Sequence, residues 1–222
     1  MRAPNRVPVF FPVPPMIVDD LIVAFDRALR TLAAGSISAR PYPAENLDAP
    51  PLDANANSQA AALMRVNHAG EICAQALYSG QALTSSNREL RRRLGSAASE
   101  ETEHLAWTER RLEELHSHTS LLNPLWYAGS FAIGAGAALI NDRVSLGFVV
   151  ETERQVEAHL GEHLEKLPDA DARSRAIVAQ MQVEEARHGA NALAAGAIEL
   201  PEPVPSIMRF AAGVMKAVAY RL

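Results

Sequence analysis

The sequence contains a single cysteine, Cys73, among its 222 residues. One thiol excludes an intramolecular disulfide and a metal site built from several thiolates, and the composition fits a reducing compartment. Basic residues are also not in excess, because the net charge is -5 and the pI is about 5.8. With no basic stripe to contact a phosphate backbone, we expect no nucleic-acid partner.

A secretory signal is not recognisable either. Prolines interrupt the only early apolar run, residues 7–15, so the charged, apolar and small-residue order of a signal peptide is not present. We therefore expect the protein to stay inside the cell. Residues 119–141 carry no charge, but Pro124 and three glycines interrupt them. This pattern favours a buried or membrane-contacting helix over a membrane span.

Proline is scarce in the middle of the chain. Of the 14 prolines, only Pro124 and Pro168 lie between Leu52 and Leu200. This stretch is rich in strong helix formers and has no long alternation of apolar and polar residues, which predicts an all-α protein. The length suits one domain with at most an appendage. We predict an N-terminal proline-rich segment, residues 1–50, with one amphipathic helix and a linker, followed by a helical bundle over residues 51–222.

Start and stop signals predict four long helices in the bundle. The first begins at the caps Asn57 and Ser58, and the second at a capping box, Ser86-Asn87-Arg88-Glu89. The fourth begins at Pro168 and Asp169. Amphipathic helices are predicted at both ends of the chain, and residues 35–56 are predicted to be an extended linker. The expected helix bounds are 16–34, 57–84, 86–117, 125–166 with a break in its first half, 168–196 and 205–222.

Acids and histidines interrupt the apolar faces of all four long helices. Glu71 lies among apolar residues of the first helix and Glu153 among those of the third. The second and fourth helices each place a Glu-x-x-His pair, whose members are neighbours on one helix face, on the apolar stripe. The chain advances by nearly the same length from each single acid to the histidine of the following Glu-x-x-His pair, which fits two antiparallel hairpins that meet at one depth. The pairs are Glu101 with His104 and Glu185 with His188.

Burying four acids without partners would cost several kcal/mol each, so shared cations are the simplest explanation. One Glu from each of two helices plus Glu-x-x-His from each of two others is the di-iron or di-manganese pattern of ferritin-like bundles. Carboxylates with one imidazole per ion suit iron or manganese better than zinc, and iron is preferred. The sequence therefore predicts that Glu71, Glu101, His104, Glu153, Glu185 and His188 bind two metal ions.

Other polar residues near these positions have alternative interpretations. His68 and His159 could orient the ligating carboxylates or have ordinary polar roles. Tyr78 could contact substrate or pass an electron, although core packing is the more usual role at its position. A further set is expected at the rim or in solvent: Glu100, Glu103, Glu151, Glu184, His116, His118 and His163.

The segment Arg65-Val66-Asn67-His68-Ala69-Gly70-Glu71, followed by Tyr78-Ser79-Gly80-Gln81, resembles the motif of demethoxyubiquinone hydroxylases. The resemblance continues through Glu101 to Leu105, Glu153 to His159 and Glu184 to His188, and it reaches the C-terminal tail. It implies a di-iron monooxygenase of ubiquinone biosynthesis, of the bacterial type, with the six residues above as iron ligands. Asn67 replaces the Asp of many relatives, and Leu160 replaces the Tyr of eukaryotic members, but neither change removes a ligand.

The resemblance implies a reaction in which O2 hydroxylates the ring of a polyprenyl benzoquinol. Electrons could come from NADH or from the quinol itself, and no Gly-x-Gly-x-x-Gly turn indicates a nucleotide-binding domain. The apolar stretch 121–140 and the end helices could form an apolar entrance at a membrane surface. We therefore expect a peripheral protein on the cytoplasmic face of the bacterial inner membrane. Candidate partners are a second copy of the chain and other ubiquinone-biosynthesis proteins.

Two other functions remain open from the residues alone. A ferritin-like iron store or peroxide scavenger would use the same six ligands, although the apolar helices at both ends argue against a storage shell. A metal-free helical lipid carrier would explain the apolar ends but would leave four core acids without partners.

Overall fold

The computed structural model describes residues 18–33, 35–48 and 50–222. Within these ranges the chain forms seven α-helices and no β-strand, which confirms the predicted all-α fold. The helices are α1 (Val18–Ala33), α2 (Ala54–Thr84), α3 (Arg88–Glu114), α4 (Asn123–Ile140), α5 (Asp142–Lys166), α6 (Ala172–Ala194) and α7 (Val204–Ala219).

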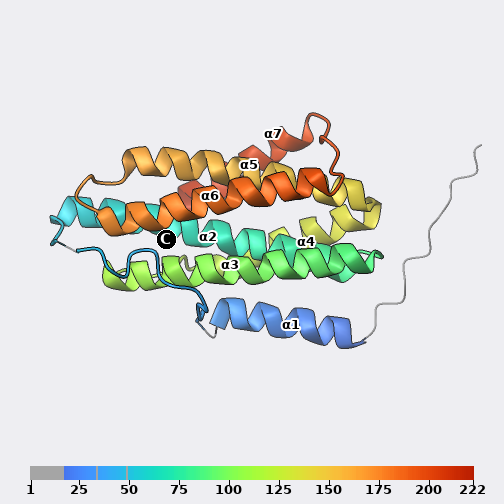
Figure 1. Cartoon of the computed structure of the whole chain (residues 1–222), viewed down its shortest axis with the longest axis horizontal. Helices are drawn as coiled ribbons and strands as arrows, with labels where there is room; N and C mark the ends of the chain where they lie inside the picture. The colour runs from blue at the N-terminus through green and yellow to red at the C-terminus, as the bar shows by residue number, and fades with distance from the viewer. Residues whose placement is uncertain (1–17, 34, 49) are drawn as a thin grey trace, which may run out of the picture.

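Four of the helices form the bundle. Figure 1 shows α2, α3, α5 and α6 lying side by side along the long axis of the molecule. A short turn after Thr84 joins α2 to α3 as one antiparallel hairpin, and α5 and α6 form the other. Helix α4 packs along α2 and carries the chain from the end of α3 to the start of α5. The two hairpins therefore face each other, as the spacing of acids and histidines predicts.

The two largest apolar clusters of the core lie along the bundle. The first cluster contains Trp107, Leu160 and Met181, and the second contains Tyr78, Leu94 and Val149. Both clusters contain side chains from α2, α3, α5 and α6. In the second cluster α6 contributes Ala192, near the end of the helix. Burial of these side chains supplies about 25 cal/mol per Å² of apolar surface and keeps the four helices in register.

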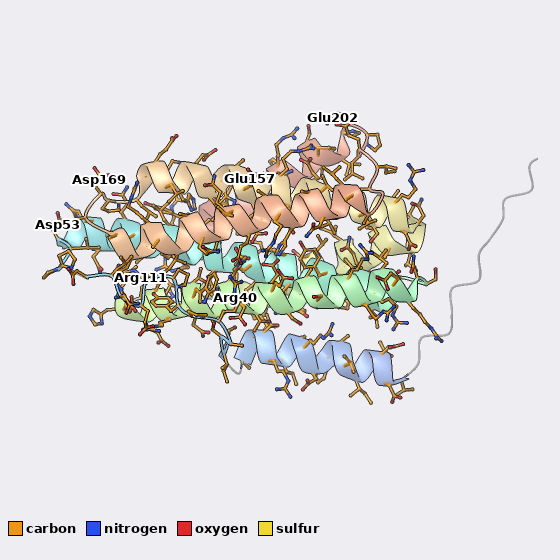
Figure 2. All side chains as sticks on the ribbon, in the orientation of Figure 1. Arg40, Asp53, Arg111, Glu157, Asp169 and Glu202 are labelled. Atoms are coloured by element: carbon orange, nitrogen blue, oxygen red, sulfur yellow. The ribbon has the colours of Figure 1, made fainter. Side chains whose placement is uncertain are left out.

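The helix starts differ from several predictions. Asp53, which accepts hydrogen bonds from the backbone N–H groups of Asn55 and Ala56, caps α2, so the predicted caps Asn57 and Ser58 are wrong. Asn87 rather than Ser86 caps α3. Asp171 caps α6, three residues after the predicted start. Figure 2 shows Asp169, just before that helix, at the same end of the bundle as Asp53. Each error has one cause: several adjacent residues could cap, and only tertiary packing selects one.

The helix ends are closer to expectation. The predicted break in the third long helix is confirmed at Asn141, whose extended backbone separates α4 from α5 and whose side chain caps α5. Gly196 has a left-handed backbone (φ 100°) just after α6, as expected for a helix-terminating glycine. Helix α3 ends at Glu114, earlier than predicted. In the expected helix 16–34, residues 16, 17 and 34 lie outside the described residues.

Residues 35–48, which we call the strap, lie against the bundle instead of extending freely. The backbone N–H of Ser36 donates to Glu109, and those of Ala39 and Arg40 donate to Glu103 on α3. Tyr42 is buried in the first cluster of the core. The segment predicted as an extended linker therefore covers one face of α3.

Large apolar side chains are exposed on three helices outside the bundle. Phe25 on α1, Leu125 on α4 and Phe210 on α7 are 65%, 59% and 75% exposed. Among the described residues, no helix combines the length and apolar character that crossing a membrane requires. The exposed apolar faces of α1, α4 and α7 are compatible with contact to another apolar surface.

Candidate metal centre

All four bundle helices point acidic side chains into the middle of the bundle. Helices α2 and α5 each supply one acid, whereas α3 and α6 each supply an acid and a histidine one helical turn apart. The positions come from helical periodicity, because residues three apart lie on the same face. The six buried side chains, none more than 7% exposed, are Glu71, Glu101, His104, Glu153, Glu185 and His188.

The donor atoms of these side chains form two overlapping groups. Glu71 and His104, which we call the first half-site, form one group with Glu101 and Glu185. The α5 acid Glu153 and the α6 histidine His188, the second half-site, form the other group with the same two acids. Within each group the donor atoms all lie within 4.8 Å of one another. The arrangement could hold two cations that share Glu101 and Glu185.

The donor set fits a pair of metal ions. Among the described residues, several buried donor atoms of the six side chains have no hydrogen-bond partner, and an unpaired buried carboxylate costs several kcal/mol. Cations would neutralise these atoms. Oxygen donors with one imidazole per ion match the preference of iron or manganese. The unpaired atoms are Oε1 and Oε2 of Glu101, Oε1 and Oε2 of Glu153, Oε1 of Glu185 and Nδ1 of His104.

Both histidines turn Nδ1 toward the shared acids. Nδ1 of His104 lies 2.9 Å from Oε1 of Glu185 and 3.3 Å from Oε2 of Glu101. Nδ1 of His188 lies 3.2 Å from Oε2 of Glu185 and 3.3 Å from Oε1 of Glu101. The two rings stack at a centroid distance of 6.3 Å. The Nδ1 atoms therefore converge on the space where cations would lie.

The acids and histidines shift one another's ionisation. Burial, with the neighbouring acids, raises the pKa of Glu71 and Glu153 well above the ordinary range of a carboxyl. Burial alone would lower the pKa of His188, but the nearby carboxylates of Glu101 and Glu185 raise it to about 12. His104 also has a raised pKa, because its carboxylate partners outweigh its burial. Each of these shifts makes the net charge of the cluster less negative, which is the charge that bound cations would neutralise.

The outer nitrogen of His104 bonds to an acid that the sequence analysis places at the rim. Nε2 of His104 lies 2.9 Å from Oε2 of Glu184, whose side chain is only 3% exposed. The rim expectation for Glu184 is therefore wrong. Arg40 of the strap forms a two-pronged ion pair with the same carboxylate, with Nη1 at 2.8 Å from Oε2. Burial opposes ionisation of Glu184, but Arg40 lowers its pKa and keeps it charged.

The outer nitrogen of His188 has a similar but exposed partner. Nε2 of His188 lies 3.0 Å from Oε2 of Glu100, and Nη2 of Arg187 lies 3.1 Å from the same oxygen. Glu100 is 40% exposed and Arg187 is 56% exposed. Glu100 therefore lies at the rim, as expected, and the outer contacts of the two half-sites differ in their access to water.

Among the described residues, neither His68 nor His159 forms a hydrogen bond with any of the six proposed ligands. Nδ1 of His68 lies 3.5 Å from the side-chain amide of Asn123, and Nδ1 of His159 lies 3.3 Å from the backbone oxygen of Gln155. Burial lowers the pKa of both to about 4, so both rings are neutral at pH 7. Neither ring makes a hydrogen bond to a ligating carboxylate in the described chain, and the orienting contacts that the structure does show are those of Glu184 and Glu100 to the two histidine ligands.

Tyr78 lies in the apolar core beside Leu90 and Leu146. Its side chain is fully buried, and its hydroxyl has no hydrogen-bond partner among the described residues. The packing role is the one that the structure shows.

Of the five remaining rim or solvent expectations, two are confirmed and three are wrong. His116 and His118 are exposed as expected, but His163 is buried, with Nδ1 2.6 Å from Oδ1 of Asn67. Glu103 is buried under the strap and Glu151 is buried beside Gln155, so the rim expectation is wrong for both.

Arg40 is the functional candidate that the sequence analysis missed. It lies in a proline-rich, non-periodic segment, so no helical spacing connects it with the centre, although Figure 2 places it next to α3 near the middle of the bundle. The sequence does give a reason to consider Glu184, because it directly precedes Glu185 in a segment that resembles the family motif.

A helical bundle whose four central helices contribute four carboxylates and two imidazoles defines a carboxylate-bundle protein of the ferritin-like class. Comparison with known proteins identifies the family within that class. The family model "Ubiquinone biosynthesis protein COQ7" matches residues 58–219. The chain belongs to the COQ7 family, which confirms the family predicted from the sequence.

Individual relatives are similar over nearly their whole length. The chain is 59% identical to the 3-demethoxyubiquinol 3-hydroxylase of Nitrosospira multiformis over 203 residues, 91% of this chain and 98% of that protein. It is 57% identical to the 3-demethoxyubiquinol 3-hydroxylase of Dechloromonas aromatica over 206 residues, 93% of this chain and 100% of that protein. The similarity thus covers the strap and the C-terminal tail as well as the bundle.

Proposed function

We propose that the protein is an enzyme that uses O2 to hydroxylate the benzoquinol ring of a polyprenylated demethoxyubiquinol in ubiquinone biosynthesis. The observation that carries this proposal is the sharing of Glu101 and Glu185 by two buried groups of donor atoms. Two metal ions in contact through common carboxylates suit a two-electron reaction with O2. The names of the relatives, 3-demethoxyubiquinol 3-hydroxylase, support the choice of substrate.

The six buried side chains are proposed to hold two iron ions. Glu71 and His104 would bind one, the second half-site would bind the other, and the shared acids would bind both. When bound, such an iron pair supplies the electrons that reduce O2 and the oxidant that inserts one oxygen atom into the ring. The proposed ligands are Glu71, Glu101, His104, Glu153, Glu185 and His188.

The surrounding residues fix the orientation of the histidine ligands. Glu184 accepts from Nε2–H of His104, which leaves Nδ1 free to face the centre. Glu100 does the same for His188. Trp107 packs against the His104 ring at a centroid distance of 5.4 Å and prevents it from turning away. These contacts prearrange the donors before any ion binds.

The electron donor is proposed to be NADH or the quinol substrate itself. The sequence contains no nucleotide-binding glycine motif, so NADH would have to bind without a dedicated domain. Reduction by the quinol needs only the substrate that already occupies the enzyme.

A polyprenyl substrate requires access from an apolar phase. We propose that the exposed apolar faces of α1, α4 and α7 rest on the cytoplasmic surface of the inner membrane, where the isoprenoid tail remains. Arg209 and Lys216 on α7 lie beside such a face and could approach anionic headgroups. Contact with a second copy of the chain or with another biosynthetic protein would cover the same faces.

Replacement of the chromosomal copy by Glu101→Ala tests the function. Mass spectrometry of the extracted quinones should show the demethoxy precursor accumulating and ubiquinone falling. The matched control is Glu113→Ala, an exposed acid on the same helix, which should leave both quinones at wild-type levels. Thermal melting of both variants checks that they fold.

Unchanged ubiquinone in cells that make folded Glu101→Ala, and that have no duplicate enzyme, would contradict the proposal. An iron-storage or peroxide-scavenging protein would then be the better explanation of the six side chains. Absence of iron and manganese from the purified wild-type protein would remove the metal centre altogether.

A further inference from the structure

The two half-sites have the same ligands but different surroundings. Each histidine offers Nδ1 to the centre and bonds through Nε2 to the acid that precedes the opposite shared ligand. For His104 that acid is Glu184, 3% exposed, and for His188 it is Glu100, 40% exposed. The half-sites therefore differ in the residues around the ligands, and first in the residues that cover each of these two acids.

Arg40 covers the outer acid of the first half-site. Its guanidinium binds both oxygens of Glu184, and Gln180 also donates to Oε1 at 2.6 Å. Its Cζ lies 4.8 Å from the centroid of the Trp107 ring, which itself packs on His104. A planar guanidinium in this position keeps the carboxylate and the indole in place together.

The strap fixes Arg40 from the other side. Glu103 accepts from the backbone N–H of Ala39 at 3.0 Å and from that of Arg40 at 3.1 Å, and it also binds the Ser38 hydroxyl. Nε1 of Trp107 donates to the same hydroxyl at 3.3 Å. Arg40 therefore reaches Glu184 from a backbone that is itself held, so little further backbone freedom is lost when the pair forms.

The second half-site has no comparable cover among the described residues. Glu100 pairs with Arg187, which is 56% exposed and belongs to the same helix as His188. An ion pair of this exposure contributes about 0–1 kcal/mol, because water competes for both partners. If the His188 ring turns away from the centre, water can replace the bond that Nε2 loses.

We propose that Arg40 is a positioning residue that makes the two half-sites unequal, so that the ion at Glu71 and His104 is retained while the ion of the second half-site exchanges readily. The inference rests on the metal centre of the proposed function. For the first ion to leave, His104 must turn and break its bond to a carboxylate that Arg40 and the strap hold still. For the second, the corresponding bond faces solvent. Loss of a residue that orients a metal ligand typically weakens metal binding by about 10- to 100-fold.

Iron release measures this inequality without turnover. The full-length protein, loaded anaerobically with ferrous iron, is mixed with a coloured ferrous chelator, and absorbance follows the iron that leaves. We expect two phases of equal amplitude whose rates differ by about tenfold or more. In Arg40→Met the slow phase should accelerate by about 10- to 100-fold and approach the fast one.

Two further variants identify the cause. Arg40→Lys keeps the charge but loses the two-pronged geometry, so its slow phase should lie between those of wild type and Arg40→Met. Arg187→Met is the matched control on the exposed half-site and should leave the slow phase unchanged, because its ion pair is solvated.

Three results would overturn the inference. They are a single release phase in wild type, a slow phase that is unchanged in Arg40→Met, and an equal acceleration of both phases in Arg40→Met, which would mean general loosening of the bundle. A wild-type protein that takes up no iron would overturn the metal centre itself, and this inference with it. The two failures are distinguished by the amount of iron loaded before the chelator is added.

Discussion

Gly80 of α2 and Gly134 of α4 lie where the backbones of their two helices touch. A Cβ atom at Gly80 would lie 2.2 Å from the carbonyl oxygen of Phe131, and one at Gly134 would lie 2.2 Å from that of Leu77. Each glycine thus faces the other helix's backbone, which cannot move aside as a flexible side chain could. This contact fixes α4 on the helix that carries Glu71.

Gly134→Ala should destabilise the protein for this reason. We expect the free energy of unfolding to fall by about 1–3 kcal/mol, since the helices must separate to admit the methyl group. Gly136→Ala is the matched control on the same helix, because a Cβ there meets nothing within 4 Å. It should gain about 0.5–1 kcal/mol from helix propensity. Urea denaturation measures both, and equal effects of the two substitutions would contradict the close contact.

Iron content should reveal which acids are shared. Glu185→Gln removes a donor from both groups and should lower iron to near zero, whereas Glu71→Gln removes a donor from one group only. The Glu71 variant should therefore retain one of the two ions. Elemental analysis of the purified variants, after a check of folding by circular dichroism, gives the stoichiometry. Equal iron loss in both would show that the acids are not shared as the geometry indicates.

Asp171→Ala should destabilise the protein independently of the metal centre. Asp171 caps α6 and lies 2.8 Å from Nη2 of the buried Arg111, so its removal leaves that guanidinium without one of its partners. We expect a loss of about 3 kcal/mol, the lower end for breaking a buried pair, because Arg111 keeps Glu114. Glu162→Ala, which breaks an exposed pair with Lys166, should cost less than about 1 kcal/mol. Similar losses in the two variants, measured by thermal or urea unfolding, would contradict the importance of burial.

Stability should fall as the pH is lowered through the range in which histidine titrates. Burial, with the nearby cationic groups, lowers the pKa of His163 to about 3, whereas an unfolded histidine has a pKa of about 6.5. Protons therefore bind the unfolded chain first, and stability that is complete above pH 6.5 is lost as the pH falls toward 3. For this one group the loss between pH 7.5 and 5.5 is about 1.4 kcal/mol.

His163→Gln tests this contribution, because glutamine can still donate to Asn67 but does not titrate. The difference in unfolding free energy between wild type and variant should shrink by about 1.4 kcal/mol from pH 7.5 to 5.5. Since both proteins contain the same metal ligands, the comparison cancels acid-dependent metal loss. Parallel pH curves would contradict a neutral buried His163.

Liposome flotation tests the proposed membrane contact. Phe210 on α7 is 75% exposed, and Phe210→Asp should reduce the fraction of protein that floats with vesicles containing anionic lipid and quinone. Val183→Asp on α6 is the matched control, because Val183 is 68% exposed but lies on a bundle helix. A wild-type protein that stays entirely in the soluble fraction would contradict the membrane proposal.

The fold and the cluster of six donor side chains follow from features that a sequence displays. Helical periodicity makes Glu101, misplaced on an apolar stripe, visible without coordinates, and a pair of matching hairpins relates the acids of separate helices. The sequence predicts a break in the first half of the third long helix but not its position at Asn141. A Gly- and Ala-rich segment weakens a helix without specifying the residue at which the helix ends.

The outer contacts could not be predicted because they depend on tertiary packing. Glu184 is offset from the apolar stripe by one residue, and the same offset puts Glu100 in solvent, so spacing alone does not distinguish a buried acid from an exposed one. His163 is buried and donates a hydrogen bond from Nδ1 to Asn67 on another helix, a partner that the spacing of residues in the sequence does not reveal. Arg40 reaches the centre from an irregular segment, where no period relates a residue to its neighbours in space.

The strap also sets an order of events during synthesis. Arg40 leaves the ribosome early, but its partner Glu184 follows 144 residues later, after the first hairpin, α4 and α5 have been made. Helix α6 must therefore dock before the ion pair between Arg40 of the strap and Glu184 can form. Until then the strap cannot cover Glu184, and the side of the centre that is most enclosed in the finished protein stays accessible to solvent.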